Sequence, residues 1–215
     1  PQKELKQIAK QLYENNFQMN THCIGDSANR MMLNIYGELL KGKNDKRWRI
    51  EHAQVVSKDD INKFGKFNII PSVQPTHCTS DMYWAESRLG NERISTAYAY
   101  RDLFFQNNLV ASGSDFPVES INPLFGFYAA VTRKDQNKTP ENGFQPENSL
   151  SREQALKSMT IWAAYANFEE QEKGSIQPGK FADFVILEDD IMKCEAGKIY
   201  EIKVESTYID GKKVY

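Results

Sequence analysis

Hydrophobic and polar positions alternate along the first three quarters of the chain with the periods of strands and helices in turn. Helical spacing is present from the start, over residues 1–13, and a chain that begins inside an amphipathic helix is expected to come from a longer protein. Unbroken apolar runs followed by amphipathic stretches are typical of a parallel sheet that helices cover. The strands predicted in this way are 17–23, 48–54, 67–73 and 109–114, and the helices are 26–42, 57–64, 94–106 and 124–132.

The last part of the chain changes to the period of strands. Before that change, Ser-Arg-Glu-Gln at Ser151 predicts a capping box for a helix that continues to about Phe168. The dipeptide Asp210-Gly211 between alternating segments is a strong hairpin signal. We therefore expect an α/β domain over residues 1–170 and a small β module over residues 171–215. The strands expected in the module are 181–187, 200–209 and 213–215.

Composition and charge exclude several classes of partner for this chain of 215 residues. A net charge of −2 with scattered Lys and Arg gives no basic patch, so no nucleic-acid partner is expected. No apolar run approaches the roughly 20 residues that span a bilayer, and the polar start is not a secretory signal, so no membrane partner is expected. Either the protein is cytoplasmic or its targeting segment has been removed. The three cysteines, Cys23, Cys78 and Cys194, are far apart and are interpreted as free thiols.

The three histidines of the sequence all fall at or just beyond the ends of predicted strands. They are His22, His52 and His77, and Asp115 occupies the matching position after the last strand of the series. A lone histidine is more often a core or loop residue than a ligand, but ends of parallel strands converge on one region. Imidazole and carboxylate are ligands that Zn²⁺ prefers, and a hydrolytic metal also needs a nearby base such as Asp115.

Several short motifs occur in a characteristic order along nearly the whole chain. The motifs are His22–Asp26, Glu51–Gln54, Gln74–His77, Trp84–Glu86, Arg88–Gly90, Gly113–Glu119 and Gly179–Val185. Together they resemble the amidohydrolase superfamily, and within it amidohydrolase family 3, the branch similar to the N-substituted formamide deformylases.

The resemblance implies a fold and a set of residue roles. The fold would be the C-terminal half of a TIM-type (β/α)8 barrel, strands five to eight, followed by a small β-sandwich module. His22, His52 and Asp115 would bind a divalent metal, expected to be zinc, and Asp115 would also carry a proton. His77 would polarise the carbonyl of a small-molecule amide substrate. The implied reaction is attack of a metal-bound hydroxide on that carbonyl, which breaks a carbon–nitrogen bond.

The sequence departs from the family in ways that matter for activity. Complete members carry a His-x-His pair on the first strand and often a carboxylated lysine on the fourth, and no His-x-His occurs here. The metal site of this chain is therefore expected to be incomplete, and the chain alone inactive. Cys23 stands where alanine is usual in the family. A half-barrel would also expose strand edges and an apolar face, which predicts self-association.

Some interpretations stay open at the level of sequence. Asp26 and Glu51 flank candidate ligands and would orient the imidazoles, but Asp26 is equally well read as a helix cap. Trp84 and Arg88 fall in a predicted long loop after the third strand, where they would form a substrate lid or only pack locally. The alternative function is a non-catalytic α/β binding module that retains the scaffold. The coding sequence upstream of Pro1 discriminates the two, since an enzyme needs the missing His-x-His.

Overall fold

The computed structural model describes residues 2–215, which divide into two compact units. The first unit contains the residues up to Val73 together with Met82–Ala111. The second contains Gln74–Asp81 and Ser112–Tyr215. The boundary expected at residue 170 concerns separately folding domains and remains a prediction.

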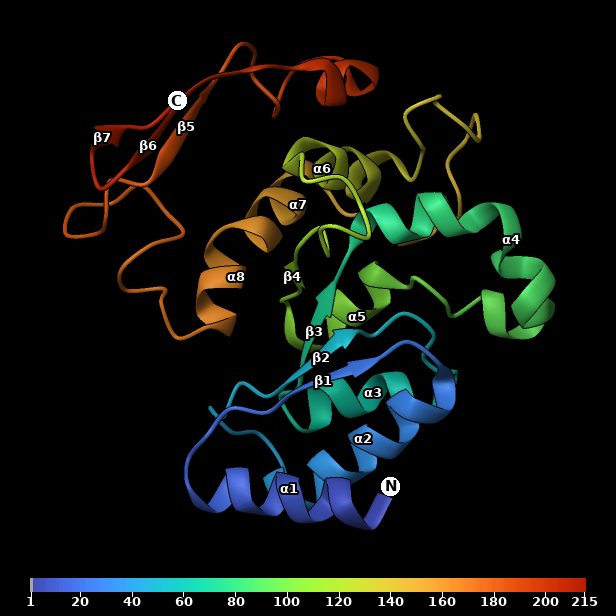
Figure 1. The fold of residues 1–215 in the computed structure, drawn as a ribbon. Helices are drawn as coiled ribbons and strands as arrows, with labels where there is room; N and C mark the ends of the chain where they lie inside the picture. The colour runs from blue at the N-terminus through green and yellow to red at the C-terminus, as the bar shows by residue number, and fades with distance from the viewer. Residues whose placement is uncertain (1) are drawn as a thin grey trace. The chain divides into compact units, whose positions relative to one another are not determined.

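The strands of the first part of the chain form the parallel sheet that the apolar runs predict. The order in the sheet is β1-β2-β3-β4, and β1 pairs with β2, and β2 with β3, in parallel (Figure 1). Each strand is shorter than the range predicted for it, and β1 and β3 comprise only the last four residues of their ranges. The bounds are β1 (Asn20–Cys23), β2 (Arg49–His52), β3 (Ile70–Val73) and β4 (Ala111–Ser112).

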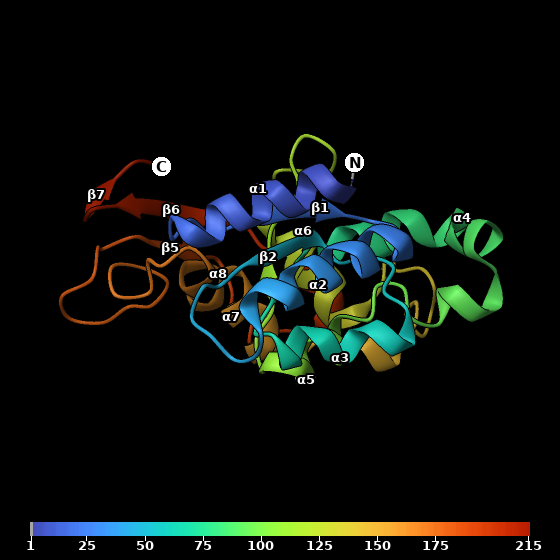
Figure 2. The same ribbon diagram turned by 90° about the horizontal axis from the view of Figure 1, so that it is seen from below.

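Helices cover one face of this sheet in the first unit, and the helix Asp26–Leu40 buries the apolar stripe that its sequence predicts. Figures 1 and 2 show α1, α2 and α3 on the same face of the sheet. The core at that face is aromatic: the Trp48 ring packs edge-on against Tyr36 at 4.8 Å between centroids, and both residues are fully buried. Within residues 2–215, no helix is long and apolar enough to cross a membrane. The helices are α1 (Gln2–Glu14), α2 (Asp26–Leu40), α3 (Lys58–Lys66) and α5 (Tyr100–Asn107).

Two expectations about helices in this region are wrong. Residues after β3 form a helix, α4 (Pro75–Ile94), in place of the long polar loop. This helix has no continuous apolar stripe that would reveal it, although Pro75 is well suited to a first helical position. Asp26 is not the cap of α2, because the N-cap is Gly25 and no side chain caps it. Asp26 lies in the first turn, where a negative charge favours the helix N-terminus.

The helices of the second unit follow their sequence signals closely. The predicted capping box is present: Ser151 accepts a hydrogen bond from the amide of Gln154, and the Gln154 side chain accepts one from Ser151. The helix expected through Phe168 is interrupted at Thr160, whose φ of −127° and ψ of −99° are not helical, so it becomes two helices. The helical segments are α6 (Pro123–Thr132), η1 (Pro146–Asn148), α7 (Arg152–Met159) and α8 (Ile161–Ala166).

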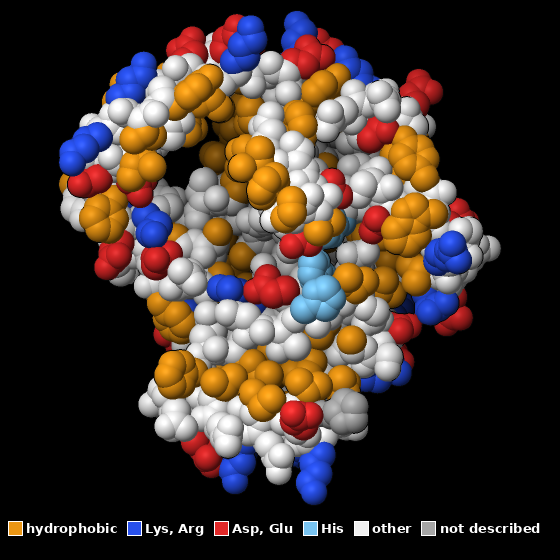
Figure 3. Space-filling model, in the orientation of Figure 1, with side chains coloured by type: hydrophobic (Ala, Val, Ile, Leu, Met, Phe, Trp, Pro, Cys, Tyr) orange, Lys and Arg blue, Asp and Glu red, His pale blue; other side chains and the backbone are white. Residues whose placement is uncertain are grey.

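The C-terminal residues form a separate antiparallel sheet of order β5-β6-β7. The hairpin predicted at Asp210-Gly211 joins β6 to β7. Val185 on β5 and Ile209 on β6 are exposed hydrophobic side chains. Figure 3 shows hydrophobic side chains at the surface of this part of the chain. The described residues thus form one layer here, and its place in a β-sandwich remains a prediction. The bounds are β5 (Phe184–Leu187), η2 (Ala196–Glu201), β6 (Val204–Ile209) and β7 (Lys212–Lys213).

Candidate metal centre

Two of the candidate ligands lie side by side in the first unit. His22 is near the end of β1, and His52 is the last residue of the neighbouring parallel strand β2. Their imidazole rings approach edge to face, with 4.4 Å between centroids and 72° between planes. His52 is 7% exposed, whereas His22 is exposed. Two nitrogens that bind one Zn²⁺ at about 2 Å must lie within about 4 Å of each other, and rings this close allow that.

The backbone at the end of β2 is held in an unusual conformation. His52 has a φ of 74° and Ala53 a φ of 44°, a left-handed region that costs non-glycine residues about 1–3 kcal/mol each. Backbone hydrogen bonds on both sides stabilise it. The amide of Val55 donates to the carbonyl of Ile24 at 2.9 Å, and the amide of Tyr98 donates to that of Gln54 at 2.7 Å. Strain retained at a candidate ligand is consistent with a functional role for His52.

Asn29 is a positioning residue that the sequence reading missed. Its side chain is fully buried in α2, and its amide nitrogen lies at hydrogen-bond distance from several backbone carbonyl oxygens. Those include the oxygen of Cys23 at 3.0 Å, the residue after His22, and the oxygen of Val55 at 3.1 Å, three residues after His52. Asn29 therefore connects the chain segments that follow His22 and His52. The sequence does contain a signal for Asn29, because it is a polar residue within the apolar stripe of a predicted helix.

The other two candidates lie together in the second unit. His77 is in the first turn of α4 and is buried, and its Nε2 lies 3.7 Å from Oδ2 of Asp115. The Asp115 side chain is 39% exposed, and its φ of 60° is left-handed. The hydroxyl of Ser80, one turn beyond His77, donates to Oε1 of Glu119 at 2.6 Å. That bond holds the loop after β4 against the start of α4.

The predicted orienting carboxylates are both engaged by arginine. Oδ2 of Asp26 lies 4.0 Å from an Arg93 nitrogen, and Oε1 of Glu51 accepts a hydrogen bond from Nε of Arg49 at 2.9 Å. These contacts neutralise the carboxylates without involving a histidine. The role of Asp26 and Glu51 in orienting the imidazoles remains a prediction.

The residues expected in a lid loop lie on a helix. Trp84 and Arg88 are on α4, four residues apart, so they share one helix face. Trp84 is 48% exposed and Arg88 is exposed, and local packing therefore does not bury either side chain. A role in contacting substrate remains a prediction for both.

Two of the thiols lie next to the candidate histidines but stay protonated. Burial raises the pKa of the Cys23 thiol, beside His22, to about 12. Burial likewise raises the pKa of Cys78, beside His77, to about 11. A thiolate is the nucleophilic and metal-binding form of cysteine, so neither side chain competes for that role at neutral pH.

Each unit thus presents a pair of groups that could serve a hydrolytic metal centre. The first unit offers two imidazoles, and the second offers an imidazole beside a carboxylate. Nitrogen and oxygen donors of these kinds suit Zn²⁺ and related divalent ions, and the carboxylate can also accept a proton.

One protein family matches the chain over its whole length. The profile described as "Amidohydrolase family" matches residues 1–215. The chain is 39% identical to Protein LONG AFTER FAR-RED 3 of Arabidopsis thaliana over 92% of this chain and 34% of that protein. It is 26% identical to the N-substituted formamide deformylase of Arthrobacter pascens over 88% of this chain and 35% of that protein.

The chain is also similar in structure to a solved metal-dependent hydrolase. The crystal structure of an uncharacterized metal-dependent hydrolase from Pyrococcus horikoshii superimposes with a TM-score of 0.78 and 26% sequence identity. The superposition covers 91% of this chain and 39% of that one. The chain therefore spans between a third and two fifths of the length of these relatives.

Proposed function

Because the chain belongs to the amidohydrolase family, we propose that it is part of a metal-dependent hydrolase that breaks carbon–nitrogen bonds in small amides. The pairing of His22 with His52 at the ends of adjacent parallel strands carries this proposal. Two relatives support it by what they are called, one as a metal-dependent hydrolase and the other as a deformylase of N-substituted formamides.

We propose that β1 to β4 correspond to strands five to eight of a (β/α)8 barrel. Support comes from the parallel order β1-β2-β3-β4 and from helices on one face of that sheet. In such barrels the active site lies at the C-terminal ends of the strands, where His22 and His52 lie. The antiparallel strands β5 to β7 would contribute one layer of a β-sandwich.

His22, His52 and Asp115 would hold a divalent ion, with zinc as the proposed metal. Two imidazoles and a carboxylate are a donor set that zinc accepts in catalytic sites, and the two imidazoles already lie close together. A bound divalent ion supplies Lewis acidity and lowers the pKa of water towards about 7.

The chain's own groups would orient the substrate and move the proton. An imidazole N–H of His77 would donate a hydrogen bond to the substrate carbonyl oxygen, where negative charge develops. The carboxylate of Asp115 would accept a proton from the attacking water and return it to the departing amine. The 3.7 Å between Nε2 of His77 and Oδ2 of Asp115 supports the proposal that both side chains act on one reacting centre.

Metal analysis together with an assay on N-formyl and N-acyl amines tests this function. The assay uses the longest protein that the gene encodes. His52→Ala is expected to lower zinc affinity by about 100-fold and to abolish hydrolysis. His77→Ala, the matched control, is expected to retain zinc while the hydrolysis rate falls by about 100-fold. Unchanged zinc content in His52→Ala would contradict the ligand assignment.

We also propose that these 215 residues alone do not hydrolyse amides. The sequence lacks the His-x-His that complete members carry. Because His77 is assigned to the substrate, only two of the three histidines remain as metal ligands, which is too few for the full ligand set. Reading the coding sequence upstream of Pro1 tests this, since the proposal expects a strand ending in His-x-His. A full reading frame without such a pair would favour the non-catalytic binding module.

Self-association of the isolated chain is a further part of the proposal. Strand edges that pair with nothing are templates for another chain, and hydrophobic side chains are exposed on β5 and β6. Light scattering is expected to show dimers or larger species that grow with concentration. A monomer at every concentration would contradict this part alone.

A further inference from the structure

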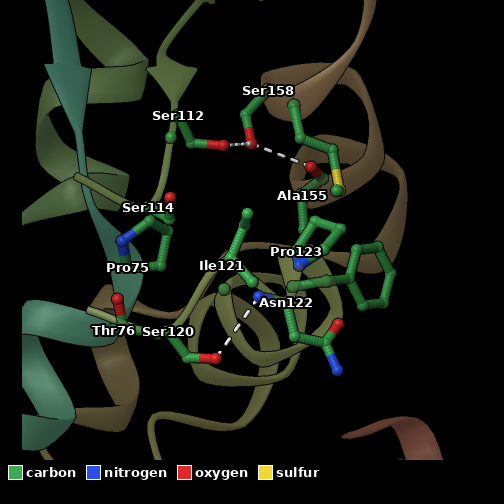
Figure 4. A pocket seen from close by; sticks show the side chains of 14 residues that line it. Pro75, Thr76, Ser112, Ser114, Ser120, Ile121, Asn122, Pro123, Ala155 and Ser158 are labelled. Carbon is green, nitrogen blue, oxygen red and sulfur yellow. Dashed lines mark hydrogen bonds between the residues drawn. The ribbon is translucent and has the colours of Figure 1, made fainter. Parts of the chain in front are cut away.

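A cavity of about 160 Å³ lies in the second unit, beside the end of β4. Its walls come from the start of α4, from the loop between β4 and α6, and from α6 and α7 (Figure 4). The lining is made by Pro75, Thr76, Ser112, Gly113, Ser114, Ser120, Ile121, Asn122, Pro123, Gly126, Phe127, Ala155, Ser158 and Met159.

The lining combines hydroxyl groups with apolar surface and contains no ionisable side chain. Placing a charged group in such a cavity would remove its hydration without providing an opposite charge, which is strongly unfavourable. A neutral group loses much less hydration free energy when it enters the cavity. The cavity therefore selects against charged ligands.

Most of the hydroxyls in the wall already have partners. Ser112 and Ser158 share a hydrogen bond of 2.8 Å, which Figure 4 shows at the top of the cavity. Ser114 accepts from the amide of Phe116, and Ser120 accepts from the amide of Asn122. Thr76 differs, because its Oγ1 is buried and has no hydrogen-bond partner. A buried hydroxyl without a hydrogen-bond partner lowers the stability of the folded chain. Thr76 Oγ1 is therefore the group expected to form a hydrogen bond with a polar atom of a ligand.

The cavity adjoins the pair of groups that the proposed function uses. Thr76 directly precedes His77, and Ser114 directly precedes Asp115. A substrate whose carbonyl lies against His77 would therefore have part of its structure within reach of the cavity. Size is also informative, since an apolar protein cavity of about 150 Å³ holds one benzene molecule.

We propose that this cavity binds an uncharged, ring-sized substituent of the substrate that carries one hydroxyl or similar polar group. Thr76 Oγ1 forms the hydrogen bond to that polar group, and Ile121, Phe127 and Met159 contact the ring. The assignment of the occupant as part of the substrate rests on the proposed function. The binding itself does not, because no metal and no reaction are needed.

Three small molecules test the proposal: phenol has a neutral ring with a hydroxyl, toluene has a ring without a hydroxyl, and benzoate has a ring with a charge. Titrated into the metal-free chain and followed by NMR, phenol is expected to bind with at least tenfold higher affinity than benzoate. The signals that move should be those of the lining residues. Equal binding of benzoate, or shifts spread over other parts of the chain, would overturn the proposal.

Thr76→Val tests the hydrogen bond because it replaces the hydroxyl with a methyl group of similar size. Phenol affinity is expected to fall about fivefold while toluene affinity is retained or rises. Thr132→Val makes the same change in α6, outside the cavity, and should alter neither affinity. Equal losses for phenol and toluene in Thr76→Val would contradict the role of Oγ1.

Gly126→Leu provides a second and independent variant. A Cβ at Gly126, in the cavity wall, meets no atom within 4 Å, so a larger side chain starts in open space there. Both phenol and toluene are expected to bind at least tenfold more weakly to this variant, and unchanged binding would overturn the proposal. Zinc binding by His22 and His52 is measured separately, so failure of the cavity and failure of the hydrolase proposal are distinguishable.

Discussion

The two candidate pairs are held in different ways. The strand ends that carry His22 and His52 are fixed by backbone hydrogen bonds and by the buried amide of Asn29. The loop that carries Asp115 is exposed and is held by the Ser80–Glu119 bond at its far end. The first pair is preorganised by the core, whereas the second depends on a surface loop. Substitutions near the first pair should therefore affect global stability, and those near the second should act locally.

Asn29→Ala is expected to have the largest effect, a loss of about 3 kcal/mol in the free energy of unfolding. The substitution leaves the carbonyls of Cys23 and Val55 without the donor that satisfies them. Urea unfolding measures the change. Asn34→Ala, on the exposed side of the same helix, is the matched control and should change stability by less than about 0.5 kcal/mol. Equal effects of the two variants would remove the contrast between the regions.

Alkaline pH should weaken the first unit through Cys23. Its pKa is about 12 in the folded chain and 9.0 ordinarily, so above pH 9 the unfolded chain binds fewer protons than the folded one. The stabilisation is complete below pH 9 and falls by up to about 1.4 kcal/mol per pH unit as the pH rises towards 12. Unfolding of the metal-free chain from pH 8 to 11 measures it. Cys23→Ala should reduce the slope and Cys194→Ala should not.

Ser151→Ala is expected to destabilise the second unit by about 1 kcal/mol. It removes the side-chain acceptor of the capping box at the start of α7. Thermal unfolding measures the change, and Ser149→Ala, two residues earlier and outside the box, should be nearly neutral. A larger loss in Ser149→Ala than in Ser151→Ala would show that the box does not stabilise α7.

Glu119→Gln should have the smallest effect, below about 1 kcal/mol, and a local one. It weakens a charge-assisted hydrogen bond with Ser80 at an exposed position. Hydrogen exchange is expected to increase for amides of the loop 113–122 and to remain unchanged around His22 and His52. Faster exchange at both pairs would mean that the two regions are not independent.

The sequence predicted most of the elements whose signals are local. The Ser151 capping box and the Asp210-Gly211 hairpin are both present, because a few neighbouring residues determine each of them. The parallel sheet also followed from its apolar runs. The candidate residues were found because histidine is rare in this chain and each one falls at or just beyond the end of a predicted strand.

The features that the sequence did not reveal depend on tertiary contacts. Helix α4 lacks an apolar stripe, so its residues were predicted to form a loop. The role of Asn29 depends on a hydrogen bond to the carbonyl of Val55, in a segment far from it in the sequence. The interruption at Thr160 has no signal in the sequence pattern. The cavity beside Thr76 likewise has walls from four separate segments, and the periodicity of the sequence does not predict that these segments come together.

Cobalt titration of the chain, followed by NMR of the histidine rings, tests most directly whether His22, His52 and Asp115 bind one divalent ion. Paramagnetic Co²⁺ is a substitute for zinc that shifts the signals of the side chains binding it. We expect the rings of His22 and His52 to shift together in one saturable step at one ion per chain, with affinity reduced at least tenfold in Asp115→Asn. Rings that shift independently, or an affinity that Asp115→Asn leaves unchanged, would contradict a shared site.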